Sequence, residues 1–410
     1  MIKMEKIMNK GILWVFDLDQ TIVESSCLED YRSKKDWAFV RANMNLVEPF
    51  GKIVDFIKKR IGERNKGVYV SVVTSSPDWY AKKIIENLGI RIEDIILVAY
   101  NETTEHKPKP EPVLRAFEKC KDMAIEAGYR IAEINCVGDC RVDYLSAVEA
   151  EEVLRERDDL EQYDRVNTIF AGWGFPGANL KSWDAKYTII CKKEEELCER
   201  YNIYKSLLPY GDGEKQDFHV EKCEEYDFIY FLTCYYPVSG VHDDLSSLFF
   251  KAIKMNDDSR FYSAVRKNYM MLVKEAIDRL AKSKNVMKGK CGIFVVPSSK
   301  QDKWSDAIVD GLLPRLKKEG YIVCYESLRR KEKLEKKLAQ GGDRSIENHL
   351  SSMEIDPMKT GDIDCAIVLD DVTTSGNSLA ACDMILLDNL DLSMEGIFNI
   401  AFVKTERIDC

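Results

Sequence analysis

Long hydrophobic runs, grouped histidines and a surplus of basic residues are all missing from this sequence of 410 residues. No apolar run approaches the roughly 18 residues that a membrane-spanning helix requires, so we expect a soluble protein. The first residues mix charges and lack the zones of a signal peptide, so we expect a cytoplasmic protein that is not exported. The net charge of -10 argues against broad, nonspecific affinity for nucleic acid.

Metal and disulfide motifs are also lacking. The 4 histidines lie too far apart to indicate a zinc motif. The 13 cysteines are scattered, and the nearest approach to a paired motif, Cys136-x3-Cys140, has neither a thioredoxin nor a zinc-ribbon spacing. We therefore expect reduced, mostly buried thiols. The most basic stretch, residues 315–337, is interleaved with glutamates and fits a solvated helical face.

A regular alternation of short apolar runs with amphipathic segments is what the sequence does contain. This rhythm is typical of mainly parallel sheets covered by helices on both faces. In the first half we expect strands at 12–16, 68–73, 95–98, 134–137, 168–171 and 187–190, and helices at 50–60, 79–87 and 112–127. In the second half we expect strands at 228–233 and 366–369, a strand running into Pro297, and a long helix at 257–282.

A change of composition marks the expected domain boundary. The length alone favours two or three domains. Around residues 207–225 the sequence turns polar and irregular, with Pro209, Gly211 and Gly213 close together, as in an interdomain linker. We therefore predict an α/β protein with two doubly wound, Rossmann-like domains, residues 1–205 and 227–410, joined by a linker at 206–226.

Two carboxylates, Asp17 and Asp19, come directly after the first expected strand. If the chain stays extended, side chains two residues apart point to the same side. Such a pair would repel a phosphate dianion, so phosphate chemistry here requires a divalent cation, which we expect to be Mg²⁺. Taken alone, an Asp-x-Asp sequence also fits a turn or a helix cap.

Further polar residues follow other expected strands. Asp139 and Asp143 come after the strand at 134–137, and Thr74 follows the strand at 68–73. Lys107 opens a Lys-Pro-Lys-Pro-Glu string before a helix, with Lys109 as the competing lysine. Because parallel strands end at one edge of a sheet, we expect these groups to meet there.

With these four motifs in this order, residues 11 to about 204 resemble a haloacid dehalogenase-superfamily phosphohydrolase. The resemblance implies that Asp17 is the nucleophile that forms an aspartyl-phosphate, and that Asp19 is the general acid/base. It also implies that Thr74 hydrogen-bonds the transferring phosphoryl group and that Lys107 neutralises its charge. The implied ligands of Mg²⁺ are Asp17, the carbonyl of Asp19, Asp139 and Asp143, the last of which binds or orients the metal shell.

The short interval between Asp17 and Thr74 leaves room for only a small lid, around residues 24–47. A site with so light a cover suits a bulky or polymeric phosphate ester, such as a nucleotide or a nucleic-acid end, or requires a partner surface as its lid. Small metabolites also fit such a site.

A second acidic motif, Asp370-Asp371, follows another apolar run and precedes a small polar loop. The two carboxylates offer acceptors for ribose hydroxyls, and the loop before the next helix offers donors for a phosphate. The pair alone also fits a helix cap. The phosphate-loop candidates are Thr374, Ser375, Gly376, Asn377 and Ser378.

Residues 228–410 resemble type I phosphoribosyltransferases, particularly the competence-protein-type branch. The likeness includes the acidic motif and the segment from Val295 to Lys300, and it implies that Ser298, Ser299 and Lys300 bind pyrophosphate with Mg²⁺. It further implies that the domain binds phosphoribosyl pyrophosphate, or a nucleoside monophosphate, and that residues 327–349 form a mobile hood. Ser375 and Ser378 stand where threonine is usual, which keeps both hydroxyls.

Together the motifs predict a bifunctional enzyme, an Mg²⁺-dependent phosphatase fused to a phosphoribosyltransferase-like domain in nucleotide or nucleic-acid phosphate metabolism. Operon-encoded protein partners or a homo-oligomer are compatible with this prediction. The alternative is a stress-response or antiphage regulatory protein whose second domain senses a nucleotide without catalysis. Base-dependent release of pyrophosphate by the second domain would distinguish the enzyme from the sensor.

Overall fold

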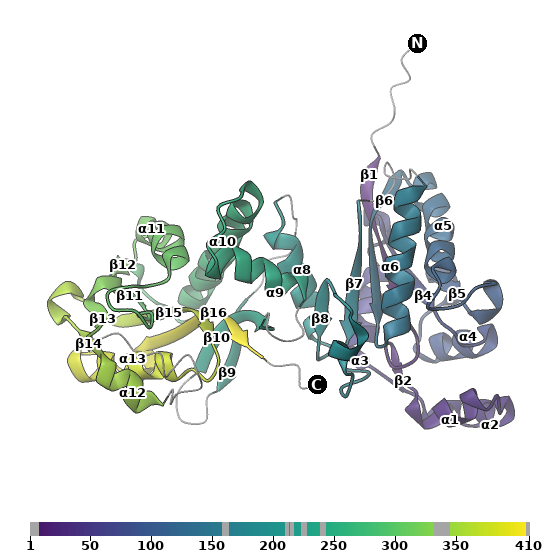
Figure 1. The fold of residues 1–410 in the computed structure, drawn as a ribbon, viewed down its shortest axis with the longest axis horizontal. Helices are drawn as coiled ribbons and strands as arrows, with labels where there is room; N and C mark the ends of the chain where they lie inside the picture. Colours follow the sequence, from purple (N-terminus) through teal and green to yellow (C-terminus); the bar gives the residue numbers. More distant parts are fainter. Residues whose placement is uncertain are drawn as a thin grey trace, which may run out of the picture. The chain divides into compact units, whose positions relative to one another are not determined.

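The computed structural model describes residues 8–157, 164–209, 213, 217–222, 228–237, 243–331 and 345–406. The chain divides into two compact units, unit 1 built on Met1–Cys198 and unit 2 built on Glu199–Val241 and Leu245–Ile408 (Figure 1). The division falls inside helix α8 (Glu196–Leu207) rather than in the predicted linker at 206–226. That predicted range includes strand β9 (His219–Lys222), and part of it lies outside the described residues.

Unit 1 is built on one six-stranded sheet in the order β5-β4-β1-β6-β7-β8, and all its neighbouring strands are parallel. This confirms the parallel sheet predicted for the first half. In chain order the strands are β1 (Asn9–Phe16), β4 (Val68–Val73), β5 (Ile96–Val98), β6 (Tyr129–Gly138), β7 (Arg165–Ala171) and β8 (Ile189–Cys191).

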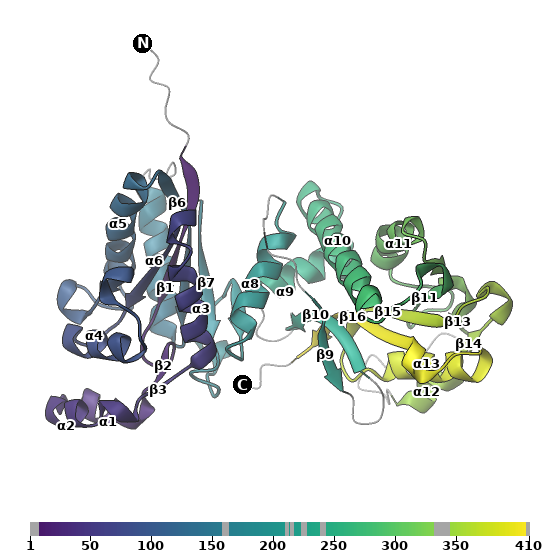
Figure 2. The same cartoon turned by 180° about the vertical axis from the view of Figure 1, so that it is seen from behind.

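Alternate side chains of β1 build the two cores on the faces of this sheet. Leu13 and Val15 pack with α5 and α6, whose buried residues include Phe117. Trp14 and Phe16 point the other way and contact the Phe56 ring of α3 at centroid distances of 4.9 and 6.2 Å. Figure 1 shows α5 and α6 in front of the sheet, and Figure 2 shows α3 on the opposite face. The helices of this unit are α3 (Gly51–Ile61), α4 (Asp78–Asn87), α5 (Glu111–Glu126), α6 (Arg141–Glu156) and α7 (Leu180–Trp183).

The insertion after β1 is a small helical lid. A two-stranded ribbon, β2 (Val23–Glu24) with β3 (Glu48–Pro49), forms its base. Between these strands lie the short helices α1 (Glu29–Ser33) and α2 (Trp37–Ala42), the latter capped by the Asp36 carboxylate. The lid is therefore as small as the sequence spacing predicts.

Unit 2 contains a second six-stranded sheet, in the order β12-β11-β15-β16-β10-β9. Neighbouring strands are parallel except at the edge, where β9 runs antiparallel to β10. A separate two-stranded ribbon pairs β13 with β14. The strands are β10 (Phe228–Tyr235), β11 (Cys291–Val295), β12 (Ile322–Val323), β13 (Leu328–Arg330), β14 (Met353–Ile355), β15 (Cys365–Thr373) and β16 (Ile397–Thr405).

Helices cover both faces of this sheet as well (Figure 1). Ala401 of β16 belongs to the core that includes α13, whereas the next side chain, Phe402, stacks on Tyr269 of α10 at 6.0 Å. The remaining helices are α9 (Asp244–Phe249), α10 (Arg260–Ser283), α11 (Leu313–Lys318), α12 (Ile346–Ser352) and α13 (Asn377–Asn389).

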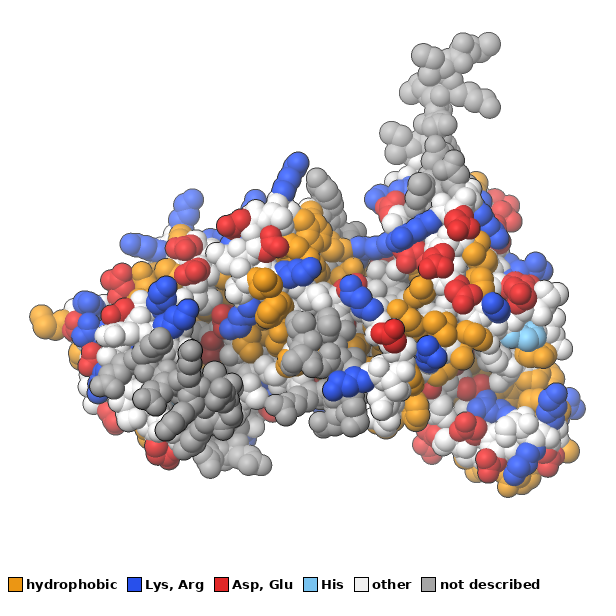
Figure 3. Space-filling model, in the orientation of Figure 1, with side chains coloured by type: hydrophobic (Ala, Val, Ile, Leu, Met, Phe, Trp, Pro, Cys, Tyr) orange, Lys and Arg blue, Asp and Glu red, His pale blue; other side chains and the backbone are white. Residues whose placement is uncertain are grey.

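Three further features concern the whole of the described structure. None of the helices in the described part is long and apolar enough to cross a bilayer. The cysteines of the described ranges are free thiols, and Cys120, Cys136 and Cys291 are among the buried ones. On the face drawn in Figure 3, acidic and basic side chains are interspersed over the described surface of each unit.

Candidate active site

The carboxyl ends of β1, β4 and β6 bring the predicted phosphatase residues of unit 1 together. Asp17 follows β1 and its amide donates to the carbonyl of Val137 at 2.9 Å, which continues the pairing with β6. A cavity of about 800 Å³ opens at this edge. Its lining includes all six predicted residues, Asp17, Asp19, Thr74, Lys107, Asp139 and Asp143.

Lys107 forms the centre of the site. Its ammonium nitrogen lies 2.6 Å from Oδ1 of Asp17, 2.6 Å from Oδ1 of Asp143 and 2.7 Å from the carbonyl of Val73. The competing Lys109 is exposed and is not among the residues that line the cavity. The geometry therefore places Lys107, and not Lys109, beside the carboxylates.

The Asp19 carboxylate is held by four side chains, none of which the sequence analysis predicted. Its carboxylate accepts hydrogen bonds from Ser25 at 2.6 Å, Ser76 at 2.7 Å and the Tyr80 hydroxyl at 2.9 Å. Arg32, from α1 of the lid, adds an ion pair. Arg32 carried no sequence signal, because a lone arginine in a short helix has no motif around it.

Two carboxyl groups of the acidic cluster, Asp17 and Asp139, have raised pKa values. Burial raises the pKa of Asp17 well above its usual value, and Asp143, Asp139 and Asp19 raise it further, while Lys107 opposes the shift. Burial, with Asp143 beside it, raises the pKa of Asp139 to about 7. Both shifts have one physical cause, since buried carboxylates favour the neutral form unless a cation compensates them.

The donor set at this cluster fits Mg²⁺, which prefers oxygen ligands. One potential ligand atom each from Asp139, Cys140 and Asp143 lies within 4.8 Å of the others. Both oxygens of Asp143 are engaged, Oδ1 by Lys107 and Oδ2 by the amide and thiol of Cys140 at 3.3 and 2.8 Å. Asp17, Asp139 and Asp143 are the side chains that would hold the ion, and Asp143 also positions Lys107 beside Asp17.

Two backbone features position the loops beside the cavity. Thr74 is buried, its amide donates to Val98 at 3.0 Å, and its hydroxyl oxygen accepts from the amide of Ser76 at 3.0 Å. Gly174 lies so close to the loop after β1 that a Cβ atom would stand 1.5 Å from the carbonyl oxygen of Gln20. The loop after β7 is therefore packed directly against the Asp17–Thr21 turn.

In unit 2 the predicted ribose-phosphate motif lies at the carboxyl end of the inner strand β15. Asp370 and Asp371 are the last acidic residues of this strand, and the amide of Asp371 donates to Asp370 Oδ1 at 2.8 Å. Burial, followed by the charge of Asp371, raises the pKa of Asp370 to about 7. Lys254 lies 2.6 Å from Asp371 Oδ1. Lys254 was not predicted, because it is distant in sequence and has no motif.

The loop that follows the acidic pair turns the chain from β15 into α13 through a left-handed glycine. Thr374, Ser375 and Gly376 connect β15 to α13, and Gly376 adopts φ +85°, a left-handed value that favours glycine. Asn377 and Ser378 form the first turn of α13. The amide groups at this helix N-terminus supply positive potential for an anion.

Ser298, Ser299 and Lys300, the residues predicted to bind pyrophosphate, follow β11. Side-chain contacts connect Ser298 with the first turn of α13. Arg330 donates from Nε to the carbonyl of Ser298 at 2.8 Å, and its guanidinium lies 3.1 Å from Nδ1 of His349. His349 Nε2 in turn lies 3.4 Å from the hydroxyl of Ser378. Ser299 and Lys300 are exposed beyond Ser298. Most of the predicted hood, residues 332–344 including Gly341 and Gly342, lies outside the described residues.

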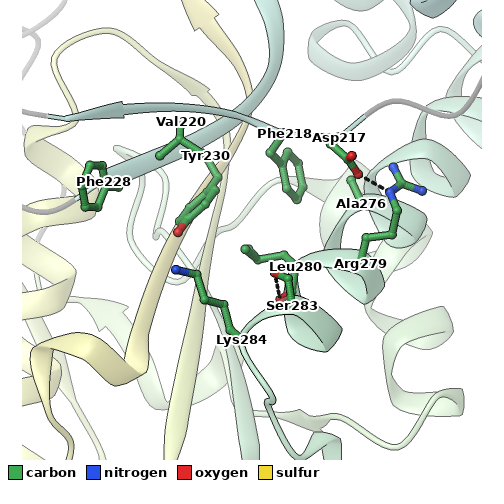
Figure 4. Close-up of a pocket in the computed structure, with 10 residues that line it drawn as sticks. All are labelled: Asp217, Phe218, Val220, Phe228, Tyr230, Ala276, Arg279, Leu280, Ser283 and Lys284. Atoms are coloured by element: carbon green, nitrogen blue, oxygen red, sulfur yellow. Dashed lines mark hydrogen bonds and ion pairs between the residues drawn. The ribbon is translucent and has the colours of Figure 1, made fainter.

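A separate cavity of about 550 Å³ in unit 2 contains none of the predicted residues. It lies between β9, β10 and the end of α10, and its Phe218 and Tyr230 rings are 6.4 Å apart (Figure 4). Lys284 and an Arg279–Asp217 pair stand among its lining residues. This cavity was not foreseen, because its residues come from distant segments.

Known proteins that are similar to this chain match less than half of its length. No protein-family model matches. The chain is 32% identical over 99 residues, 24% of its own length, to a protein of Caldanaerobacter subterraneus named "Putative pyrophosphatase PpaX". The chain spans 42% of that relative's length.

Solved structures with a likeness to this chain include two hydrolases. A hydrolase from Pseudomonas syringae is 15% identical, with a TM-score of 0.33, over 45% of this chain and 94% of the other. A haloacid dehalogenase-superfamily hydrolase of subfamily IA from Geobacter sulfurreducens is 16% identical, with a TM-score of 0.29, over 46% of this chain and 97% of the other.

Proposed function

We propose that unit 1 is an Mg²⁺-dependent phosphomonoester hydrolase that works through an aspartyl-phosphate. The observation that supports the proposal is the position of Lys107 at the carboxyl end of β1. Its ammonium nitrogen lies 2.6 Å from a carboxylate oxygen of Asp17 and 2.6 Å from one of Asp143. By holding Oδ1 of Asp17, Lys107 leaves Oδ2 as the oxygen that attacks phosphorus. A bound Mg²⁺ would neutralise the phosphoryl oxygens and the acidic cluster.

Asp19 would move the protons of the reaction. In the first step the bond between phosphorus and the leaving oxygen breaks, and Asp19 gives that oxygen its proton. In the second step Asp19 takes a proton from water, which attacks the phosphorus and releases Asp17 and phosphate. The hydrogen bonds from Ser25, Ser76 and Tyr80 hold the carboxylate in place for both steps.

Replacement of the proposed nucleophile tests this function. We expect Asp17→Asn to lower phosphate release from p-nitrophenyl phosphate by at least about a thousandfold, because an amide cannot form the acyl phosphate. Asp122→Asn, an exposed change on α5, is the control and should keep the wild-type rate. Equal turnover by Asp17→Asn and the wild type would exclude Asp17 as the nucleophile.

For unit 2 we propose binding of phosphoribosyl pyrophosphate or another ribose 5-phosphate compound. Asp370 and Asp371 would accept hydrogen bonds from the ribose hydroxyls, and the loop from Thr374 to Ser378 would hold the 5′-phosphate. Ser298, Ser299 and Lys300 would contact the pyrophosphate. The left-handed Gly376 at the strand-to-helix turn and the contacts that connect Ser298 with Ser378 support this assignment.

Two outcomes remain for that domain, a phosphoribosyltransferase or a sensor. Lys254 pairs with Asp371 at 2.6 Å, and a ribose hydroxyl would have to displace it in either case. Incubation with phosphoribosyl pyrophosphate and a panel of bases tests the choice. Base-dependent release of pyrophosphate identifies a transferase, whereas binding without release identifies a regulatory domain. A double Asp370→Asn, Asp371→Asn variant that binds as tightly as the wild type would contradict both.

A further inference from the structure

The cavity of unit 1 is lined by aromatic side chains as well as by the acidic residues. Three rings line it, each from a different element: Trp37 opens α2 of the lid, Trp79 lies in the first turn of α4, and Tyr100 follows β5. Trp37 and Trp79 are half-buried, and Tyr100 is 48% exposed. We call these three residues the aromatic wall.

The rings of the wall are held in place by their neighbours. Trp37 meets Trp79 edge to face at 5.8 Å, and the guanidinium of Arg41 lies 4.4 Å from the Trp79 ring centre. Tyr100 stacks one of its faces on His106 at 3.8 Å. Rings fixed in this way lose little conformational freedom when a planar ligand binds, which favours stacking.

The remaining lining residues define the other end of a ligand. Asp17 and Lys107 mark the proposed point of phosphoryl transfer. Lys35 of the lid and Arg32, which pairs with Asp19, line the same cavity. A cavity of about 800 Å³ has room for much more than a phosphate group. An ester that uses the whole cavity needs a phosphate at one end and a flat, apolar ring system at the other.

We propose that unit 1 hydrolyses the phosphate of nucleoside phosphate esters and that the aromatic wall stacks on the base. The inference rests on the proposed phosphatase function and adds its substrate class. Base stacking on aromatic side chains tolerates different bases, so the wall selects for a base without selecting one sequence. The same chemistry suits a free mononucleotide and the phosphorylated end of an oligonucleotide, because the lid is small and the cavity is open.

Paired substrates test the inference. The measured quantity is the ratio of kcat/KM for adenosine 5′-monophosphate to kcat/KM for ribose 5-phosphate, which share the phosphate and ribose and differ in the base. We expect a ratio of at least about 10 in the wild type, and a fall of the ratio by about tenfold in Trp37→Leu and in Trp79→Leu. Phe39→Leu is the matched control, because this lid aromatic stacks on Tyr31 at 3.7 Å and does not line the cavity.

The outcomes separate this inference from the function on which it rests. A ratio near 1 in an enzyme that hydrolyses both esters overturns the base-stacking inference and leaves the phosphatase proposal intact. An equal fall in Phe39→Leu overturns it too, because the rings then act only in folding the lid. Absence of turnover with every ester contradicts both proposals. A 5′-phosphorylated oligonucleotide forms a further arm, and preference for it over the mononucleotide identifies a nucleic-acid end as the source.

Discussion

The ammonium group of Lys107 lies 2.6 Å from Oδ1 of Asp17, and the two side chains are only 5% and 12% exposed. These residues are ninety positions apart, and neither is held by local structure alone. Their contact ties the segment before α5 to the end of β1. It also compensates one of the buried negative charges at a site where desolvation favours neutral carboxyl groups.

We predict that Lys107→Met destabilises the protein by about 3–5 kcal/mol, because removal of one partner leaves buried charges unpaired. Urea denaturation followed by circular dichroism at neutral pH without Mg²⁺ measures the effect. Lys109→Met is the control, since this side chain is exposed and outside the cavity, and its effect should stay within about 0.5 kcal/mol. Equal effects of the two changes would show that the Lys107 contacts contribute nothing to stability.

Magnesium should stabilise the protein through Asp17 and Asp139. At a concentration about 100 times its dissociation constant, the ion adds about 2.7 kcal/mol to the free energy of unfolding. Differential scanning calorimetry with and without EDTA measures the shift of the midpoint. Asp139 has a pKa of about 7, so the affinity should fall as the pH drops below 7 and protons compete with the metal. A midpoint that Mg²⁺ shifts as strongly in Asp139→Asn as in the wild type would rule out Asp139 as a ligand.

The contact between Gly174 and Gln20 predicts a steric effect. Gly174→Ala would place Cβ 1.5 Å from the Gln20 carbonyl oxygen, so the loop must move. We expect a loss of about 3 kcal/mol or more, together with reduced phosphatase activity, because the displaced turn carries Asp17 and Asp19. Thermal unfolding and steady-state kinetics measure both effects. The neighbouring Gly177→Ala has open space around it and should be neutral; a neutral Gly174→Ala would refute the close packing.

In unit 2 the raised pKa of Asp370 predicts a pH dependence of stability. The folded-state pKa of about 7 lies above the usual 3.8, so the folded protein binds this proton more tightly than the unfolded chain does. The contribution is therefore fully present below about pH 4 and is lost as the pH rises through 7, by up to about 1.36 kcal/mol per pH unit. Unfolding experiments between pH 4 and 8 should give a flatter profile for Asp370→Asn, and an unchanged one for the exposed Asp388→Asn. Identical slopes for Asp370→Asn and the wild type would contradict the assignment.

The first residues of β6 and β7 could not be predicted from the local pattern of apolar residues. Sequence periodicity predicts strands from 134 and 168, but β6 begins at Tyr129 and β7 at Arg165. The added residues are partly polar, and Glu133 is buried because Arg165 pairs with it at 2.6 Å across the two strands. A pairing between distant segments has no local signature, so a polar residue there gives no sign of a buried strand.

The sequence by itself determined the parallel sheet of unit 1 and the meeting of Asp17, Thr74 and Asp139 at its edge. Apolar runs with a polar residue at their end, connected by helices, can pack in few ways, and the parallel order collects the ends. Lys107, the lysine chosen from the sequence, lies beside Asp17, but only the tertiary structure placed Arg32 on Asp19 and the aromatic wall in the same cavity. These contacts depend on how the lid and loops fold over the sheet. They join residues far apart in the sequence, and the number of residues between them does not predict that they are close in space.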